Sequence, residues 1–344
     1  MSPKYRGDSE DWLDADEASH GRGRKRSALK AKKLGEKSGT ELPLSDSNAV
    51  VVEVFPNQCR VLTDKEGCEL LCSYRRASIF GIEKKDVRSR TPVAVGDRVV
   101  VARFGESENT GIIEGICIRR NSIYRLAPGG ENRFHRLASN IDLVAIVASA
   151  NQPAFSPWLI DRFLIGAQVE GIDCLICINK SDLMTSDHAW SVYRDLGYLV
   201  YEVSTRTLTG IDQLKEQCLD KAVVFCGHSG VGKTSLMRAL TGRQIGRVGE
   251  VNEATGKGRH TTTGAILIQG PEHSKWIDTP GIREFGLMNV RPQDIAQAFP
   301  EFRNLKCKAP SCLHLDEPGC LAQSSLRYPN YRRILKSLLE KESN

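Results

Sequence analysis

The segment Gly-His-Ser-Gly-Val-Gly-Lys-Thr at residues 227–234 constrains the fold of this chain more than any other feature. It completes the pattern G-x-x-x-x-G-K-[ST], follows an apolar run at 222–226, and leads into an amphipathic run at 233–241. This order predicts a strand, a phosphate-binding loop and a helix, because the glycines let backbone N–H groups face phosphate oxygens and the helix N-terminus adds positive charge. A glycine-rich turn without a ligand is the alternative, and the flanking pattern disfavours it.

Each residue of this loop has an expected task. Lys233 is expected to reach the β- and γ-phosphates and to assist catalysis, and the Thr234 hydroxyl is expected to hold Mg²⁺. The expected nucleotide-binding residues of the loop are Gly227, His228, Ser229, Gly230, Val231, Gly232, Lys233, Thr234 and Ser235.

Two further motifs indicate which nucleotide binds. Asp278-Thr279-Pro280-Gly281 ends an apolar run, where a carboxylate on the metal side (Asp278) and a glycine that senses the γ-phosphate (Gly281) are needed. Asn179-Lys180-Ser181-Asp182 ends another apolar run, and the Asp182 carboxylate can accept both donors of guanine's N1/N2 edge, which adenine lacks. Ser204 and Thr205 follow a third expected strand and can supply the loop behind the base. The motifs therefore predict a guanine nucleotide site.

Strands and helices alternate through the region that carries these motifs, which predicts a mostly parallel sheet covered by helices on both faces. Helices are expected near 157–170, 211–219 and 233–241. Strands are expected at 142–148, 173–178, 199–203, 222–226, 265–269 and 274–277.

The order of the motifs along the chain differs from that of a conventional GTPase. Asn179–Asp182 and Ser204 come before the phosphate loop, Thr261–Thr263 and Asp278–Gly281, instead of after them. The same site can assemble if the usual termini are joined and the chain is cut elsewhere, because domain termini often lie close together. The order predicts a circularly permuted GTPase domain over 119–287, with 119–136 as a connector. After Gly281 the chain then leads directly into the C-terminal domain.

Five short runs rich in β-branched residues lie between residues 49 and 118 and are separated by turn signals such as Pro56-Asn57. Five strands in such a span predict a small barrel similar to the oligonucleotide/oligosaccharide-binding (OB) fold. Cations lie near two aromatic residues in the segment from Tyr74 to Arg90, which is either a local nucleic-acid patch or a solvated face. The expected strands are 49–55, 59–63, 68–74, 98–104 and 111–118.

Residues 1–48 differ in composition from the rest of the chain. Acidic residues crowd positions 8–17, basic residues crowd 22–37, and little apolar material lies between them, which predicts a disordered charged arm. Two interpretations remain open: a solvated tail without a specific role, or a basic arm that touches nucleic-acid phosphates.

A cysteine cluster marks the C-terminal segment, 288–344. Cys307, Cys312, His314 and Cys320 lie within 14 residues of one another. Three thiols and one imidazole form a closed tetrahedral set for one structural Zn²⁺, and a redox thiol group is the alternative. An amphipathic stretch, Tyr331–Leu339, completes an expected mainly helical zinc-binding domain.

Composition excludes two further classes of protein. No apolar run reaches the roughly 18 residues that a membrane span needs, and the first 30 residues lack the apolar core of a secretion signal. The formal net charge of +6 mildly favours an anionic partner. The odd number of cysteines, 11, fits reduced thiols and metal ligands better than disulfides. We therefore expect a cytoplasmic protein.

The full set of motifs resembles one family, the ribosome small-subunit-dependent GTPase A (RsgA) family, over residues 49–344. The matching segments also include Gly96-Asp97-Arg98-Val99 and Arg259-His260-Thr261-Thr262-Thr263. The resemblance implies a multi-domain chain with an OB-like β-barrel, a circularly permuted α/β P-loop GTPase domain and a zinc domain. It further implies Mg²⁺-dependent hydrolysis of GTP to GDP, stimulated by the small ribosomal subunit during its late maturation, with rRNA contacts from the barrel and the zinc domain, in a monomer.

The resemblance also bears on the attacking water. Conventional GTPases often place a water-orienting Gln directly after D-x-x-G, and here that position is Ile282, which cannot orient water. His260 matches the histidine implicated in the family and is the expected catalytic replacement, as a base or as a group that positions the water. A surface or core histidine without that role is the alternative.

Two other functions are alternatives to GTP hydrolysis as a switch. An RNA-binding structural factor could use GTP mainly to hold one conformation, and single-turnover hydrolysis with and without ribosomal subunits separates it from an enzyme. An ATP-dependent kinase would need an adenine preference, against which Asp182 argues.

Overall fold

The structure is a computed structural model. It describes residues 41–74, 92–103, 109–126, 134–184, 188–242, 265–279, 286–287, 290–307 and 312–342. Most of the charged arm lies outside these residues. Its last part, 41–48, has defined structure: Leu42 bridges to Cys117, and a 3₁₀ turn, η1, spans Leu44–Asp46. The expected arm includes this part, but the N–H of Leu42 donates to the carbonyl of Ile116 and the N–H of Ile118 donates to the carbonyl of Leu42, so these residues are held in place.

Five strands form the N-terminal barrel, in the order β1-β2-β3-β5-β4, and a pairing of β1 with β4 closes it. Alternate residues of each strand face inward, as in β3, where Leu70 and Cys72 are buried and their neighbours are not. This closure and order confirm the OB-like barrel expected from the sequence. The strands are β1 (Ala49–Phe55), β2 (Gln58–Thr63), β3 (Glu69–Tyr74), β4 (Arg98–Arg103) and β5 (Thr110–Ile116).

The motif Gly96-Asp97 has a structural task at the base of the barrel. Gly96 has a φ of +86°, and a Cβ there would lie 2.3 Å from the carbonyl oxygen of Ser139. The buried Asp97 carboxylate accepts the backbone N–H of Ala94 at 2.8 Å and pairs with Arg119 at 2.6 Å. These contacts hold the turn that precedes β4.

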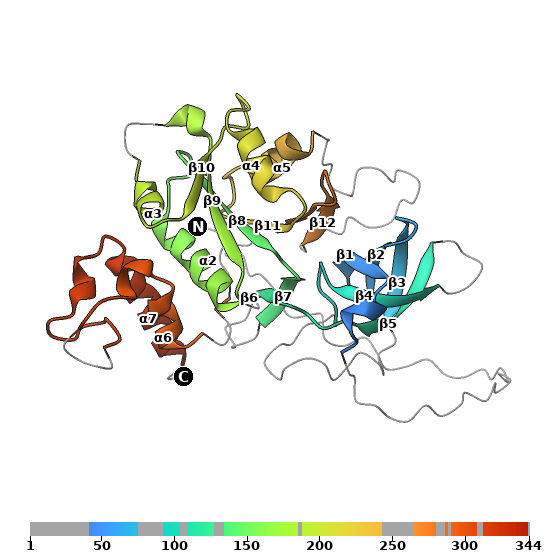
Figure 1. Ribbon diagram of the computed structural model, residues 1–344, viewed down its shortest axis with the longest axis horizontal. Helices are drawn as coiled ribbons and strands as arrows, with labels where there is room; N and C mark the ends of the chain where they lie inside the picture. The colour runs from blue at the N-terminus through green and yellow to red at the C-terminus, as the bar shows by residue number, and fades with distance from the viewer. Residues whose placement is uncertain are drawn as a thin grey trace, which may run out of the picture. The chain divides into compact units, whose positions relative to one another are not determined.

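A second group of strands forms the α/β sheet, in the order β10-β9-β8-β11-β13-β12. The first five strands are parallel, and β12 is antiparallel to β13. Figure 1 shows the helices arranged around this sheet. The strands are β8 (Leu143–Ser149), β9 (Asp173–Asn179), β10 (Leu199–Glu202), β11 (Ala222–Cys226), β12 (Ile266–Gln269) and β13 (Lys275–Asp278).

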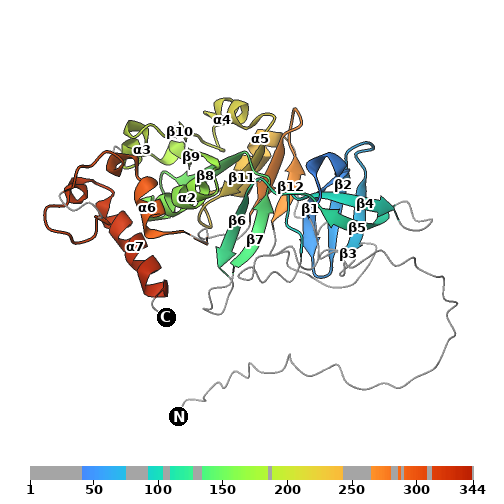
Figure 2. The same ribbon diagram turned by 60° about the horizontal axis from the view of Figure 1, so that its bottom comes forward.

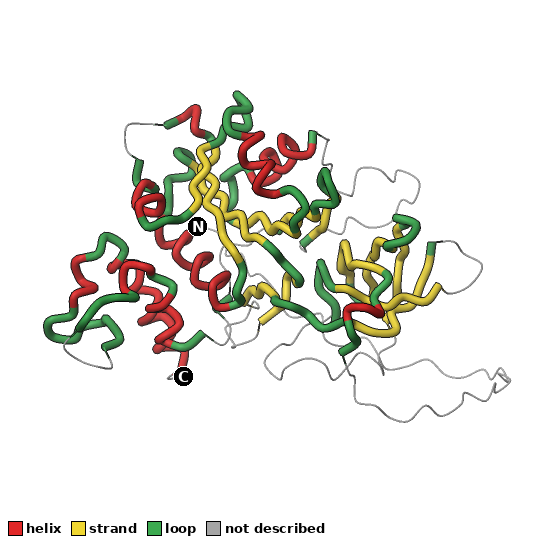
Figure 3. Tube along the Cα trace, in the orientation of Figure 1, coloured by secondary structure: helices red, strands yellow, loops and turns green. Residues whose placement is uncertain are grey.

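Helices cover both faces of this sheet, as the alternation in the sequence predicted. In β8, Val144 and Ile146 pack into the same core as Phe163 of α2, whereas Ala145 and Val147 pack with Leu236 of α5 on the other face. Figure 3 shows these helices on either side of the strands. The helices are α2 (Pro157–Val169), the 3₁₀ turn η2 (Ser181–Leu183), α3 (Ser191–Asp195), α4 (Ile211–Cys218) and α5 (Lys233–Thr241).

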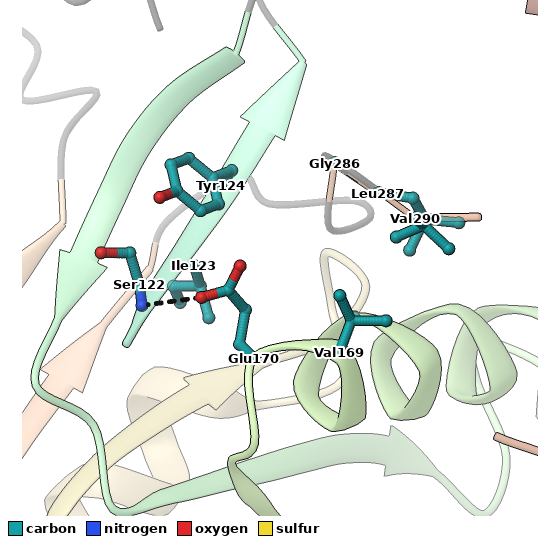
Figure 4. Close-up of a pocket in the computed structure, with 9 residues that line it drawn as sticks. Ser122, Ile123, Tyr124, Val169, Glu170, Gly286, Leu287 and Val290 are labelled. Atoms are coloured by element: carbon teal, nitrogen blue, oxygen red, sulfur yellow. Dashed lines mark hydrogen bonds between the residues drawn. The ribbon is translucent and has the colours of Figure 1, made fainter. Parts of the chain in front are cut away.

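A β-hairpin of β6 (Ser122–Leu126) and β7 (Phe134–Ser139) lies partly within the expected connector, 119–136. The backbone N–H of Ser122 donates to the carboxylate of Glu170, at the end of α2, at 3.1 Å. Figure 4 shows this bond and the small pocket beside it, which Leu287 and Val290 also line. The backbone N–H of Gly286 donates to the carbonyl of Tyr124 at 2.8 Å, so a residue that follows the D-x-x-G motif lies against the hairpin.

The barrel is continuous with the α/β sheet. Glu53 of β1 pairs with Ile266 of β12 in an antiparallel register. Val50 and Val52 of β1 share a core with Leu267 of β12. The barrel and the sheet therefore meet through an apolar contact as well as through backbone pairing.

The C-terminal unit packs against α2 (Figure 2). Its core is apolar and aromatic, including Phe299, Phe302 and Tyr331, and Ile165 of α2 belongs to the same core. The last helix is longer than the expected Tyr331–Leu339. The elements are α6 (Pro292–Gln297), the 3₁₀ turns η3 (Pro300–Phe302) and η4 (Leu321–Ser324), and α7 (Tyr328–Glu342).

Within the described part of the chain, none of the helices has both the length and the apolar character that a bilayer crossing requires.

Candidate functional site

The candidate nucleotide site lies where the parallel strands end. β11 leads into the phosphate loop, β13 ends at Asp278, and β9 ends at Asn179. The chain runs from β8 to β9 and β10 on one side and to β11 and β13 on the other, so the strand order reverses between β8 and β11. The carboxyl ends of strands at such a reversal form the usual ligand crevice of open α/β sheets.

The phosphate loop has a backbone that only glycine allows at two positions. Gly227 has a φ of +145°, and a Cβ there would lie 2.0 Å from the carbonyl oxygen of Val147. Gly232 has a φ of +94°, and a Cβ there would lie 2.4 Å from the side-chain nitrogen of Asn179. The loop therefore lies directly against β8 and against the end of β9.

Lys233 begins α5 and is buried, with a relative exposure of 9%. Its Nζ donates to the carbonyls of Gly227 at 2.8 Å and His228 at 3.1 Å, inside the curve of the loop. Burial lowers the pKa of this amine, and the neighbouring Asp278 carboxylate opposes that effect. The amine is thus held beside the space that the loop encloses, where it can neutralise a phosphate.

Asp278 and Thr234 offer the oxygen ligands that Mg²⁺ prefers. Oδ1 of Asp278 is buried and has no hydrogen-bond partner among the described residues. Burial raises the pKa of this carboxyl, and Lys233 and the backbone N–H of Thr279 lower it. Thr234 is exposed in the first turn of α5. An unpartnered buried carboxylate oxygen at the end of β13 and an exposed hydroxyl in the first turn of α5 are donors that fit a hard cation.

Asn179 and Lys180 join the N-K-x-D motif to the phosphate loop. The buried side-chain amide of Asn179 donates to the carbonyl of Val231 at 2.9 Å. Nζ of Lys180 donates to the carbonyl of Gly230 at 2.8 Å and also to that of Gln152. Two segments that are about 50 residues apart in the chain are therefore held together by side chains of the motif.

Asp182 is oriented by Ser204. The Ser204 hydroxyl donates to Oδ1 of Asp182 at 2.7 Å. The Ser204 Oγ atom in turn accepts the backbone N–H groups of Arg206 at 3.2 Å and Thr207 at 3.1 Å, so the turn after β10 fixes the hydroxyl. The guanidinium of Arg206 lies 3.8 Å from Oδ2 of Asp182 and is largely exposed. This arrangement presents a carboxylate that can accept from the edge of guanine.

Several residues named from the sequence lie outside the described residues. They are His260, Thr261–Thr263, Gly281, Ile282 and most of the cationic segment after Tyr74. Tyr74 itself donates its hydroxyl hydrogen to the carbonyl of Gln58 at 2.6 Å. The sequence motifs did not identify Gln152 and Arg206 as parts of the site, because neither occupies a motif position. The structure identifies Gln152 by its contact with Lys180 and Arg206 by its contact with Asp182.

The four zinc-ligand candidates meet at one point. The Sγ atoms of Cys307, Cys312 and Cys320 lie 3.5, 3.5 and 3.3 Å from Nδ1 of His314. All four ligand atoms lie within 4.8 Å of one another, and they form the one such group within the described ranges. Separations of this size are those of ligands around a tetrahedral metal with bonds of about 2.0–2.3 Å. The donor set, three thiols and one imidazole, fits Zn²⁺.

Neighbouring groups fix the backbone around this cluster. The Glu317 carboxylate accepts the N–H groups of Leu313 at 2.8 Å and Leu315 at 2.7 Å, on either side of His314. The ring of Phe302 lies 5.5 Å from that of His314. The other eight cysteines are free, and most of them are buried. Burial of this kind is common for free cysteines, which behave as small apolar residues.

The chain has a phosphate loop and an N-K-x-D carboxylate in permuted order, between an OB-like barrel and a Cys3His unit. This combination defines the class of circularly permuted P-loop GTPases. The model of the family described as RsgA GTPase matches residues 116–288. Together with the relatives described next, this match shows that the chain belongs to the RsgA GTPase family, as the sequence motifs predicted.

Relatives and solved structures extend this similarity to most of the chain. A protein of Shewanella oneidensis named small ribosomal subunit biogenesis GTPase RsgA is 34% identical over 330 residues, 89% of each chain. One of the same name from Gemmatimonas aurantiaca is 35% identical over 276 residues, 76% of this chain and 90% of the relative.

The crystal structure of YjeQ from Thermotoga maritima has a TM-score of 0.63 and 27% identity, covering 85% of this chain and 98% of that one. YloQ, described as a circularly permuted GTPase, has a TM-score of 0.60 and 25% identity, covering 90% of this chain and 99% of that one.

Proposed function

We propose that this GTPase binds the small ribosomal subunit, is stimulated by it, and hydrolyses GTP as a switch in the late maturation of that subunit. The observation that carries the proposal is the Ser204–Asp182 pair beside the phosphate loop, in a chain whose relatives are named small ribosomal subunit biogenesis GTPases. We further propose that it acts in the cytoplasm as a monomer, with GTP and GDP as its nucleotides.

In the proposed nucleotide complex, each described group has one task. The Asp182 carboxylate accepts from the guanine edge, and Ser204 keeps it oriented. The Lys233 amine leaves its loop carbonyls and neutralises the β- and γ-phosphates. Asp278 and Thr234 would hold Mg²⁺, which supplies charge neutralisation on the phosphate oxygens when bound. The glycines at 227, 230 and 232 leave the backbone N–H groups free to face the phosphates.

The attacking water needs a positioning group, because Ile282 stands where a Gln is common. We assign this task to His260, and Gly281 is assigned to the γ-phosphate. In the proposal, the small subunit brings His260 to the water, and such a group contributes about 10²–10⁴-fold to the rate. His260→Ala should therefore keep GTP-dependent subunit binding and lose most of the stimulated hydrolysis.

Contacts with rRNA are assigned to the barrel and to the C-terminal unit. The cationic segment that follows Tyr74 supplies phosphate contacts beside aromatic rings. The Cys3His cluster holds one structural Zn²⁺ per chain, which stabilises the C-terminal unit without an open position for a catalytic water.

The switch requires that the two nucleotide states bind the subunit differently, since a nucleotide shifts an equilibrium only by its differential affinity. The GTP form should bind small subunits more tightly than the GDP form. Co-sedimentation with a non-hydrolysable GTP analogue, GDP or no nucleotide tests this, and equal binding in all three states would remove the switch. Single-turnover hydrolysis with and without subunits separates an enzyme from an RNA-binding factor that only holds GTP.

A further inference from the structure

A buried ion pair, Asp161 with Arg327, joins the C-terminal unit to the GTPase domain, and neither residue belongs to a sequence motif. Asp161, in α2, has no exposed surface, and Arg327, just before α7, is 2% exposed. Nε of Arg327 donates to Oδ1 of Asp161 at 3.0 Å, and Nη2 lies 2.9 Å from the same oxygen. Nη1 pairs with Glu301 at 3.1 Å. The guanidinium of Arg327 therefore contacts one carboxylate from each domain, Asp161 of the GTPase domain and Glu301 of the C-terminal unit.

Other groups complete the surroundings of this pair. Asn330 of α7 donates to Oδ2 of Asp161 at 2.7 Å. The hydroxyl of Tyr193, in α3, lies 2.9 Å from Oδ1 of the same carboxylate. The Arg327 guanidinium lies over three aromatic rings, at 4.4 Å from Phe299, 5.1 Å from Tyr193 and 5.8 Å from Tyr198. Groups from both domains thus surround both charges.

A buried ion pair of this kind contributes little net free energy to stability. Removing two charges from water offsets much of their attraction, and well-packed apolar residues in their place are often as stable or more stable. The apolar contact of Ile165 with the C-terminal core already supplies attraction between the two units. A buried pair with directional hydrogen bonds adds what apolar packing lacks, which is a single relative orientation.

The pair is also linked to the nucleotide site through Tyr193 and the loop before α2. The Tyr193 hydroxyl lies 3.0 Å from the carbonyl of Pro157, the first residue of α2. The loop just before α2 contains Gln152, whose carbonyl accepts from Lys180 of the N-K-x-D motif. It also contains Pro153, whose Cδ would lie 3.8 Å from a Cβ on Gly230 of the phosphate loop. Contacts therefore run from Arg327 through Tyr193 to the start of α2, and the loop before α2 lies against Lys180 and close to Gly230.

We propose that Asp161 and Arg327 are a positioning pair that fixes the C-terminal unit on α2 and couples it to the nucleotide site. The bound nucleotide then changes the stability of the C-terminal unit, and binding of the C-terminal unit to a partner changes the nucleotide site by the same free energy. Where the partner is the small ribosomal subunit, the inference rests on the proposed function and makes the pair necessary for stimulation.

The test replaces both charges by apolar groups of similar size, in Asp161→Leu, Arg327→Met and the double variant. Arg327→Met leaves the buried Asp161 carboxylate without its cation, whereas Asp161→Leu leaves Arg327 with Glu301 as its one acidic partner. Each single variant should therefore unfold at a lower temperature. The double variant should regain most of the loss, so that its folding and its zinc content match those of the wild type. Arg332→Met removes a half-exposed charge from the same helix α7 and serves as the control.

The first readout needs no ribosome. Amide hydrogen exchange over α7 should differ between the GTP-analogue and GDP forms of the wild type and of Arg332→Met, by about threefold or more in rate. The double variant should show equal exchange in both forms while binding GTP within about twofold of the wild type. Equal exchange in both forms of the wild type, or a retained difference in the double variant, would overturn the coupling.

The second readout is subunit-stimulated turnover. The double variant should lose at least tenfold of the stimulation while its turnover without subunits stays within about twofold of the wild type. Wild-type stimulation in the double variant would contradict the role of the pair. A wild type that shows the exchange difference but no stimulation by small subunits would instead contradict the proposed function and leave the coupling supported.

Discussion

The side-chain amide of Asn179 donates to the backbone carbonyl of Val231 at 2.9 Å, and neither group is exposed beyond 2%. Asn179 belongs to the base-recognition motif, and Val231 belongs to the phosphate loop. In this permuted chain the two motifs lie 52 residues apart, with the base motif first. The hydrogen bond therefore fixes the distance between the two halves of a site whose order in the chain has been rearranged.

The close approach of Gly232 to Asn179 predicts that a side chain at position 232 weakens GTP binding. In Gly232→Ala the new Cβ would lie 2.4 Å from Nδ2 of Asn179, so the loop and the motif must separate. We expect GTP affinity to fall at least tenfold, measured by titration calorimetry. Gly242→Ala is the control, because Gly242 also has a positive φ, +64°, but its new Cβ would have no non-neighbouring atom of the described residues within 4 Å. That variant should lose about 1 kcal/mol of stability from its backbone and keep its affinity. Equal affinity in the two variants would contradict the contact.

Guanine selectivity is expected to depend on Asp182. Asp182→Asn keeps an oxygen for the Ser204 hydroxyl but replaces the other acceptor with a donor that faces the N–H groups of guanine. The loss should be about 1–3 kcal/mol, with poorer discrimination against xanthosine triphosphate. Competition binding with GTP, ATP and xanthosine triphosphate measures it. Asp212→Asn, an exposed acid on α4, is the control. Unchanged affinities for GTP and xanthosine triphosphate would remove Asp182 from base recognition.

The magnesium assignment can be tested at Thr234 with two substitutions. Thr234→Ser keeps the hydroxyl, and Thr234→Val keeps the shape of the side chain without it. We expect the serine variant to retain Mg²⁺-dependent GTP turnover and the valine variant to lose about tenfold or more, since the hydroxyl is a metal ligand in this type of loop. If the valine variant responds to Mg²⁺ as the wild type does, another group holds the ion.

The metal content should be one Zn²⁺ per chain. Cys312→Ala removes one of four ligands and should release the ion and unfold the C-terminal unit locally, because metal-binding energy in such a site is folding energy. The GTPase domain has its own sheet and should still bind GTP. Elemental analysis and nucleotide titration check both points, with the exposed Cys68→Ala as the control. Zinc-free wild-type protein purified without chelator would contradict the assignment.

The sequence predicted those parts of the fold that follow from local pattern. The strands before Asn179, Gly227 and Asp278 are apolar runs that end at recognisable motifs, and the structure has strands there. The β6–β7 hairpin was missed because the alternation of apolar residues is broken at Ile123-Tyr124, where the strand pairing shifts register, and at His135-Arg136.

The pairing of Asp161 with Arg327 could not be predicted from the sequence. The two residues are 166 positions apart, and neither lies in a motif. A lone acid in an apolar helical run is the one signal that the sequence offers, since an unpaired buried charge is costly. Its partner is known only once the two domains are packed together.

The most direct test of the central claim is GTP turnover measured with isolated small ribosomal subunits, with large subunits and with neither, in the wild type and in His260→Ala. We expect slow turnover alone and with large subunits, and a stimulation of about 10²-fold or more by small subunits. His260→Ala should bind small subunits with the GTP analogue and lose most of that stimulation. Equal turnover of the wild type under all three conditions would contradict the proposal that this protein is a GTPase switch of the small subunit.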